Sequence, residues 1–222
     1  MIPGTFNSLI GTSGTVPIYV GTGGRTVTSG TSSNTATYPD GVLPGDLLLF
    51  IAQCDNADTI NTPSGFTFVQ SGGSSSSICK YRVFYKFHTT GTGVSVRASG
   101  DHLCGGIVAF RYINASSPIG NLVSNHTNSG NLSVPMPTTA NNNSIVLTVA
   151  GHQRNSTSPQ FSNWANPSLV DFQEILDVST TVGWDGGVGV AYGLKVLAGA
   201  VSNTTATFSS TSICGGIVLN PV

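Results

Sequence analysis

The pentapeptide Cys-Gly-Gly-Ile-Val occurs twice in this chain, at residues 104–108 and again at residues 214–218. A phosphate-binding glycine loop would lead into a helix, with Lys or Ser/Thr at a set spacing. Here the first copy continues as Ala-Phe-Arg-Tyr, which is more strand. Two glycines inside a strand let a neighbouring backbone or an aromatic ring approach closely, or form a bulge. We therefore interpret the pentapeptide as the mark of a duplicated fold.

Other segments repeat in the same order. "TYPDGVLPGDLLLFIA" (37–52) aligns with "PMPTTANNNSIVLTVA" (135–150) at an offset of 98, and the same offset carries Phe66 onto Trp164. The sequence thus predicts two related halves, about 18–115 and 116–222. No Pro/Ser-rich linker separates them, and a few strands alone would leave one sheet face bare. We expect both halves to complete one domain over 18–222, a jelly-roll-like two-sheet β-sandwich, with two tandem sandwiches as the alternative.

Hydrophobic periodicity predicts an all-β fold. "CKYRVFYKF" (79–87) and "VGVAYGLKV" (188–196) alternate between apolar and other residues with the period of a strand. "LLLFIAQ" (47–53) and "IVLTVAG" (145–151) are continuous apolar runs, short enough to be strands covered on both faces. No stretch has a convincing helical period.

Composition narrows the class of protein. Charged residues make up 8% of the 222 residues, against about a quarter in an ordinary soluble domain. The net charge of −1 gives no field to attract nucleic acid or an anionic membrane. A polar surface made of Ser, Thr, Asn and Gly suits a protein packed against copies of itself, on a particle or in a fibre, or one that faces sugars. It argues against a free cytosolic enzyme.

The sequence contains no signal for export or membrane insertion that we recognise. The N-terminus lacks the basic and apolar regions of a secretory signal, and no apolar run approaches the length of a membrane span. The four cysteines, at 54, 79, 104 and 214, show no CxxC pairing, so we predict reduced, buried thiols.

Residues that could carry chemistry are few. Most of the acidic residues fall in apparent turns, and Asp46, which opens a strand, suggests a turn-closing role. Asp55 and Asp58 could offer oxygen ligands to Ca²⁺, but their loop lacks the glycine and distal glutamate of an EF-hand. His102 and Cys104 share one strand face without a second pair of zinc ligands. We therefore predict no catalytic, cofactor-binding or metal-binding residues, and a protein that is not an enzyme.

Two features remain as candidate contact sites. Trp184, in "GWDGG", has no counterpart in the other half and is a candidate surface contact for a sugar. Residues 1–17 precede the first repeat and are either a frayed tail or an arm that lies along a neighbouring subunit. The apolar anchors of that predicted assembly arm are Ile2, Phe6, Leu9 and Ile10.

The stretch "YPDGVLPGDLLLFIAQ…TPSGFTFVQ…YRVFYKF…GGIVAFRYI" resembles a β-sandwich domain of tailed-phage virion structural proteins. The resemblance covers most of residues 35–222 and is weaker in the second half. Phe66 stands where tryptophan is common. The matching residues are Gly45, Asp46, Leu47, Leu48, Pro63, Gly65, Tyr81, Tyr85, Gly105, Gly106 and Arg111. Such motifs specify a fold better than a function.

The resemblance implies a non-enzymatic component of a bacteriophage virion. We expect a head decoration or cement protein, a homotrimer that binds the major capsid protein on the capsid exterior and stabilises the capsid after assembly in the host cytoplasm. It implies no cofactor and no nucleic acid or membrane partner. The alternative is a tail-associated protein that binds a receptor or carbohydrate. A secreted glycan hydrolase is disfavoured by the missing export signal and the sparse acids.

Overall fold

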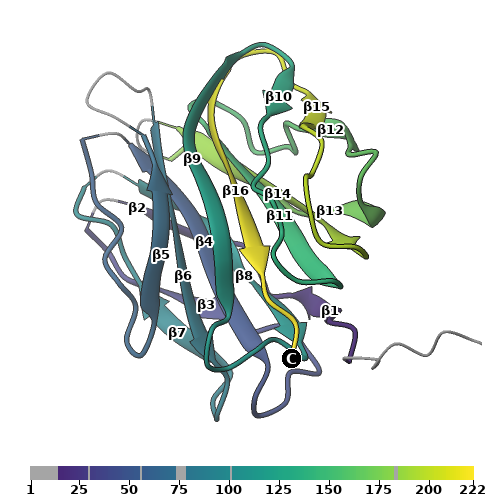
Figure 1. The fold of residues 1–222 in the computed structure, drawn as a ribbon. Coiled ribbons are helices and arrows are strands. Elements are labelled where there is room, and N and C mark those ends of the chain that lie inside the picture. The colour runs from purple at the N-terminus through teal and green to yellow at the C-terminus, as the bar shows by residue number, and fades with distance from the viewer. Residues whose placement is uncertain (1–14, 30, 56, 74–78, 101, 183–184) are drawn as a thin grey trace, which may run out of the picture.

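The computed structural model describes residues 15–29, 31–55, 57–73, 79–100, 102–182 and 185–222 (Figure 1). In these residues the chain is all-β, as the sequence predicts, and no helix is present. Their strands are β1 (Ile18–Thr22), β2 (Thr26–Ser29), β3 (Asn34–Thr37), β4 (Leu47–Asp55), β5 (Thr67–Gly72), β6 (Cys79–Phe87), β7 (Gly93–Val96), β8 (His102–Arg111), β9 (Ile119–Ser129), β10 (Leu132–Val134), β11 (Ser144–His152), β12 (Ser162–Ala165), β13 (Val170–Thr180), β14 (Gly186–Lys195), β15 (Thr204–Thr207) and β16 (Thr211–Leu219).

Two large antiparallel sheets form the centre of the molecule (Figure 1). In the first sheet the neighbours run β1-β8-β4-β6-β5, and β2 also pairs with β8. In the second sheet they run β9-β16-β11-β14-β13. Two small sheets, β3-β7 and β10-β15-β12, complete the fold. The result is a β-sandwich, in which each large sheet draws its strands from one continuous part of the chain; the jelly-roll topology stays a prediction.

Three clusters of buried apolar side chains account for the continuous apolar runs in the sequence. The central cluster joins the two large sheets, with Leu47, Leu49 and Ile51 on one side and residues such as Leu147 on the other. A second cluster lies on the outer face of the first sheet, beneath β3 and β7. A third lies on the outer face of the second sheet, beneath β10, β12 and β15. Strands β4 and β11 are therefore buried on both faces, which is why they read as continuous apolar runs.

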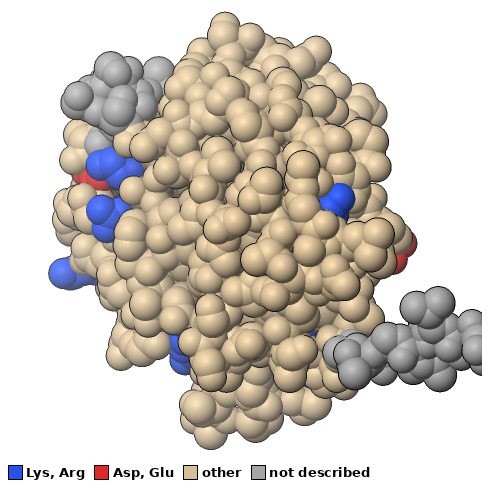
Figure 2. All heavy atoms as spheres, viewed as in Figure 1, with Lys and Arg blue, Asp and Glu red and all other residues tan. Residues whose placement is uncertain are grey.

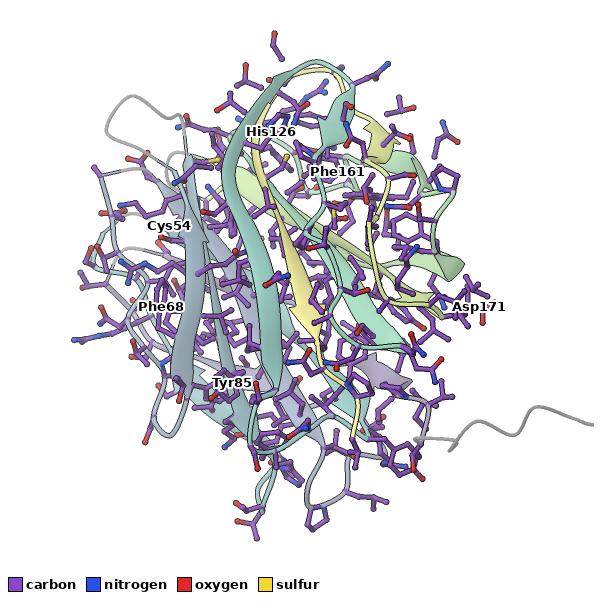
Figure 3. All side chains as sticks on the ribbon, in the orientation of Figure 1. Cys54, Phe68, Tyr85, His126, Phe161 and Asp171 are labelled. Carbon is purple, nitrogen blue, oxygen red and sulfur yellow. The ribbon has the colours of Figure 1, made fainter. Side chains whose placement is uncertain are left out.

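Side chains fill the space between the sheets (Figure 3). All four cysteines are buried free thiols, as the sequence predicts. Burial raises the pKa of Cys54 to about 12, so this thiol stays protonated at neutral pH.

The glycines of the repeated pentapeptide accept close neighbours. A Cβ atom at Gly105 would overlap the carbonyl of Ile51, and one at Gly215 would overlap the hydroxyl of Tyr81. The predicted close approach of a backbone and an aromatic ring is confirmed. Tyr81 belongs to the first sheet and reaches across the central core to the second, so the missing side chain at 215 is what allows the two sheets to pack at this point.

Asp46 closes a turn, as predicted, and also makes an ion pair. Its Oδ2 accepts a hydrogen bond from the Leu43 amide at 2.7 Å. Arg111 donates from Nε to Oδ1 at 2.7 Å and from Nη2 to Oδ2 at 2.8 Å. Burial acts to raise the pKa of Asp46, but the hydrogen bonds and charge of Arg111 outweigh it and lower that pKa below its usual value. This pair links the start of β4 to the end of β8.

Candidate functional site

The contact residues predicted from the sequence lie outside the described residues. This holds for the arm anchors Ile2, Phe6, Leu9 and Ile10 and for Trp184.

One end of the sandwich is unusually apolar. Of the ten large hydrophobic side chains that are exposed among the described residues, eight lie at the end where β1 begins and β8, β14 and β16 finish. The register brings three of them close together, because Ile18 pairs with Arg111, which precedes Tyr112, and the Val222 amide donates to the Tyr112 carbonyl at 3.1 Å. Val170 and Val196 lie at the adjoining ends of β13 and β14, in the second large sheet. We call this surface the apolar end; its residues are Val16, Ile18, Leu43, Tyr112, Val170, Val196, Leu197 and Val222. The C-terminus and β1 mark it in Figure 1.

A groove of about 370 Å³ opens within the apolar end. Leu43, Tyr112 and Val222 contribute its exposed apolar walls, with exposed fractions of 53%, 43% and 66%. The Asp46–Arg111 ion pair also lines the groove. Exposed apolar side chains gathered in this way mark an interaction surface more often than a catalytic one.

Charged side chains are sparse on the surface that Figure 2 shows. Three cations lie on the outward face of β6: Lys80, Arg82 and Lys86. Arg82 lies 5.6 Å from the centre of the Phe68 ring, and Lys86 lies 4.9 Å from that of Tyr38, so these cations cover aromatic rings.

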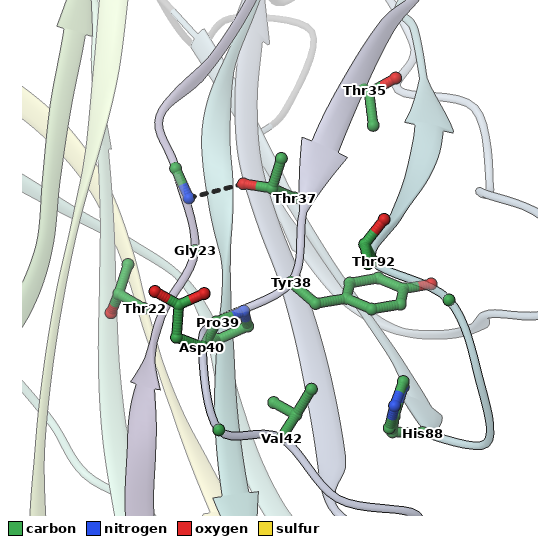
Figure 4. Close-up of a pocket in the computed structure, with 13 residues that line it drawn as sticks. Thr22, Gly23, Thr35, Thr37, Tyr38, Pro39, Asp40, Val42, His88 and Thr92 are labelled. Carbon is green, nitrogen blue, oxygen red and sulfur yellow. Dashed lines mark hydrogen bonds between the residues drawn. The ribbon is translucent and has the colours of Figure 1, made fainter.

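A second concave surface, of about 630 Å³, lies on the flank of the first half (Figure 4). We call it the polar hollow. Its walls come from the link between β1 and β2, from β3 with the turn after it, and from the turn after β6. The lining residues are Thr22, Gly23, Gly24, Thr35, Thr37, Tyr38, Pro39, Asp40, Gly41, Val42, His88, Gly91 and Thr92.

Hydrogen bonds and ring contacts fix the walls of the polar hollow. The Gly24 amide donates to Thr37 Oγ1 at 2.8 Å, and the Tyr38 amide donates to the Thr92 carbonyl at 2.9 Å. The ring of His88 meets that of Tyr38 edge-on, with centres 5.5 Å apart. Both rings are buried, so they shape the floor of the hollow and cannot swing outward as a stacking platform.

Two histidines among the described residues are fully buried inside the sandwich. His152 is fully buried against Phe161 and Phe208, and its Nε2 lies 3.1 Å from Ser179 Oγ. Burial lowers the pKa of His152 to about 4, so the ring is neutral at pH 7. His102, also fully buried, lies 3.0 Å from Gln53 Oε1 through its Nε2. Neither imidazole reaches a cleft, which general acid–base catalysis would require.

Burial also raises the pKa of Asp177 to about 6, although the amides of Gln160 and Phe161 both donate to its Oδ2. These two bonds hold the chain against β13, a structural role.

The part of the chain that the structure describes holds no group of three or more His, Cys, Asp or Glu side chains placed to bind a metal ion. In the loop after β4, Lys80 Nζ donates to the Asp58 carbonyl at 2.9 Å. Within the described residues, no helix has the length and apolar character needed to cross a membrane.

No protein-family model, no curated protein and no solved structure matches this chain.

Sequence reasoning missed both surfaces. The residues of the apolar end come from strand ends and loops far apart in the chain, so no local pattern signals them. Asp40 and Gly41 belong to the Pro-Asp-Gly motif that the sequence marks only as a turn. Its position beside Thr35 and Thr92 depends on the pairing of β3 with β7.

Proposed function

We propose that this protein is a non-enzymatic structural protein of a virus particle, a decoration protein that binds an assembled phage head through its apolar end. The observation that carries the proposal is that eight of the ten large apolar side chains exposed among the described residues lie at one end of the sandwich. The resemblance of residues 35–222 to phage structural domains agrees with it.

The physical argument is burial of surface. Burying a fully exposed large apolar side chain contributes roughly 1.5–3 kcal/mol, so each of these half-exposed side chains contributes about half as much. Several such side chains per subunit, repeated in a homotrimer, bind a repeating shell with avidity. A protein that binds only the assembled shell stabilises that state by mass action. Because the apolar end has few charges, binding is expected to depend only weakly on salt.

The location of the protein in its native particle tests the proposal. Antibody and gold label spread over the head supports a decoration protein. Label confined to the tail tip contradicts it and favours the receptor- or carbohydrate-binding alternative. Label on no particle excludes both virion functions.

The surface itself is tested with purified protein and emptied heads. The triple variant Leu43→Ser, Tyr112→Ser, Val222→Ser is expected to lose head binding without unfolding, since all three side chains are exposed. Leu122→Ser is the matched control, because Leu122 is 41% exposed on β9, outside the apolar end. Equal head binding by the triple variant and the control would exclude the apolar end as the contact surface.

A further inference from the structure

The polar hollow has no role in the proposed function, since it shares no lining residue with the apolar end. We propose that it is a binding site for a neutral saccharide. The size of the hollow, the chemistry of its walls and the hydrogen-bonding groups that the fold leaves open there favour such a ligand.

The size and composition restrict the ligand. A volume of about 630 Å³ lies within the range of small-molecule sites. The walls are mainly threonine and glycine, so they offer little apolar area to a lipid or a hydrophobic peptide. They contain no Lys or Arg, and the Asp40 carboxylate repels anions, which disfavours phosphates and sialic acids. A neutral ligand rich in hydroxyl groups fits these restrictions.

The open polar groups match hydroxyls. Among the described residues the carboxylate of Asp40 has no hydrogen-bond or ion-pair partner, and the side chain is exposed. The exposed side-chain hydroxyls of Thr35 and Thr92 are likewise open. A carboxylate accepts hydrogen bonds, whereas a threonine hydroxyl both donates and accepts. Sugar hydroxyls likewise donate and accept hydrogen bonds.

The three open groups also come from separate, well-anchored segments. Thr35 lies on β3, Asp40 on the turn after it and Thr92 on the turn before β7, and β3 pairs with β7 along its whole length. The Thr37–Gly24 bond and the Tyr38–Thr92 backbone bond hold the walls in place. Because these walls are already ordered, the protein loses little conformational entropy when a sugar binds.

The test is titration of the full chain, isotopically labelled, with neutral saccharides followed through the amide NMR signals. The probes are lactose, maltotriose and N,N′-diacetylchitobiose, with glucose 6-phosphate as the anionic comparison. We expect one neutral probe to shift the amide signals of Gly23, Gly24, Gly41, Gly91 and Thr92 saturably at millimolar concentration. Glucose 6-phosphate, which the Asp40 carboxylate repels, is expected to leave them unchanged.

Matched variants identify the binding groups. Asp40→Asn with Thr92→Val is expected to weaken binding by about tenfold or more, because it removes a charged acceptor and a hydroxyl. Asp171→Asn with Thr67→Val makes the same chemical changes at exposed positions outside the hollow and is expected to bind as the unaltered protein does. Unchanged thermal midpoints show that both variants are folded.

Three results would overturn the inference. They are the absence of shifts with every neutral probe, shifts confined to amides outside the hollow, and preferential binding of glucose 6-phosphate. Equal affinity of the two double variants would also overturn it. Because head binding is measured separately, failure here leaves the proposed decoration function standing, and the reverse is also true.

Discussion

The two copies of Cys-Gly-Gly-Ile-Val look interchangeable in the sequence, but they are not in the fold. In the first sheet Gln53 pairs with Cys104, whereas in the second Gly151, ninety-eight positions later, pairs with Ile213. Strand β16 is therefore displaced by one residue from the alignment of the pentapeptides. Cys104 faces the central core, and Cys214 faces the outer cluster of the second sheet.

The residues in corresponding places are thus Gly106 and Gly215, since they pair with Ile51 and Val149. Both face the central core, but they meet different partners. A Cβ at Gly106 would lie 3.1 Å from the flexible tip of Leu176, while one at Gly215 would overlap the Tyr81 hydroxyl and approach the Val123 carbonyl at 2.5 Å. The same five-residue sequence therefore packs against different neighbours in the two sheets.

The largest effect that we predict is on the free energy of unfolding, when each of these two glycines is replaced by alanine. Gly215→Ala should destabilise the protein by about 3 kcal/mol, because the new methyl group meets a ring and a backbone that cannot both move. Gly106→Ala should cost about 1 kcal/mol or less, since Leu176 can shift its tip. Urea unfolding measures both.

Tyr81→Phe added to Gly215→Ala should recover part of the loss, because it removes the hydroxyl that the methyl group would overlap. Equal costs for the two glycine substitutions would show that the Tyr81 contact is not what distinguishes the strands.

The ends of β4 and β11 carry different titratable groups. Cys54 lies near the end of β4, and His152, ninety-eight positions later, ends β11. The thiol stays neutral, but the imidazole titrates. The folded pKa of His152 is about 4 against 6.5 in an unfolded chain, so its contribution to stability is lost as the pH falls from 6.5 to 4. The folded pKa of Asp177 is about 6 against 3.8, so its contribution grows as the pH falls from 6 to 3.8.

Each shift of about two pKa units corresponds to about 3 kcal/mol, and the two have opposite signs. The stability of the unaltered protein should therefore change little between pH 6.5 and pH 4. His152→Cys should become more stable over that range, relative to its own value at pH 6.5, and Asp177→Asn should become less stable. Urea midpoints recorded across the range measure the slopes; parallel profiles for the two variants would contradict this assignment.

The starts of the same strands differ in charge. Asp46 bonds to Arg111, while Ser144, ninety-eight positions later, donates from its hydroxyl to the Asn141 carbonyl at 2.8 Å. Asp46→Asn should cost about 2 kcal/mol, because it removes the ion pair of a side chain that is 2% exposed. Ser144→Ala should cost about 1 kcal/mol, the usual value of a neutral hydrogen bond. Thermal unfolding at pH 7 checks both, and a reversed order would show that the ion pair adds no stability.

The strands, their buried faces and the roles of several buried residues could be predicted from the sequence. The apolar alternation in 79–87 and the continuous runs at 47–53 and 145–151 determine strands and the faces they bury, because a strand presents successive side chains to opposite sides. The four buried thiols and the turn-closing role of Asp46 followed from the same local reasoning.

Other features depended on contacts between distant segments. The one-residue displacement of β16 is visible only in the pairing of β11 with β16, whereas the pentapeptides by themselves align Cys104 with Cys214. The apolar end and the polar hollow unite residues from loops far apart in the chain, and no periodic pattern marks them. Of the candidate sites that the sequence did suggest, Trp184 and the arm anchors Ile2, Phe6, Leu9 and Ile10 fall outside the described residues, and only residues 15–17 of the predicted arm are described.

The sequence by itself therefore determined the class of the fold, its strands and their buried faces, since these follow from a two-residue period within each strand. Only the tertiary structure decided which glycine receives Tyr81, which end of the sandwich is apolar and which threonines share a hollow. The physical reason is that surfaces and sheet-to-sheet register arise from many weak contacts between residues remote in sequence, and a local pattern contains no record of them.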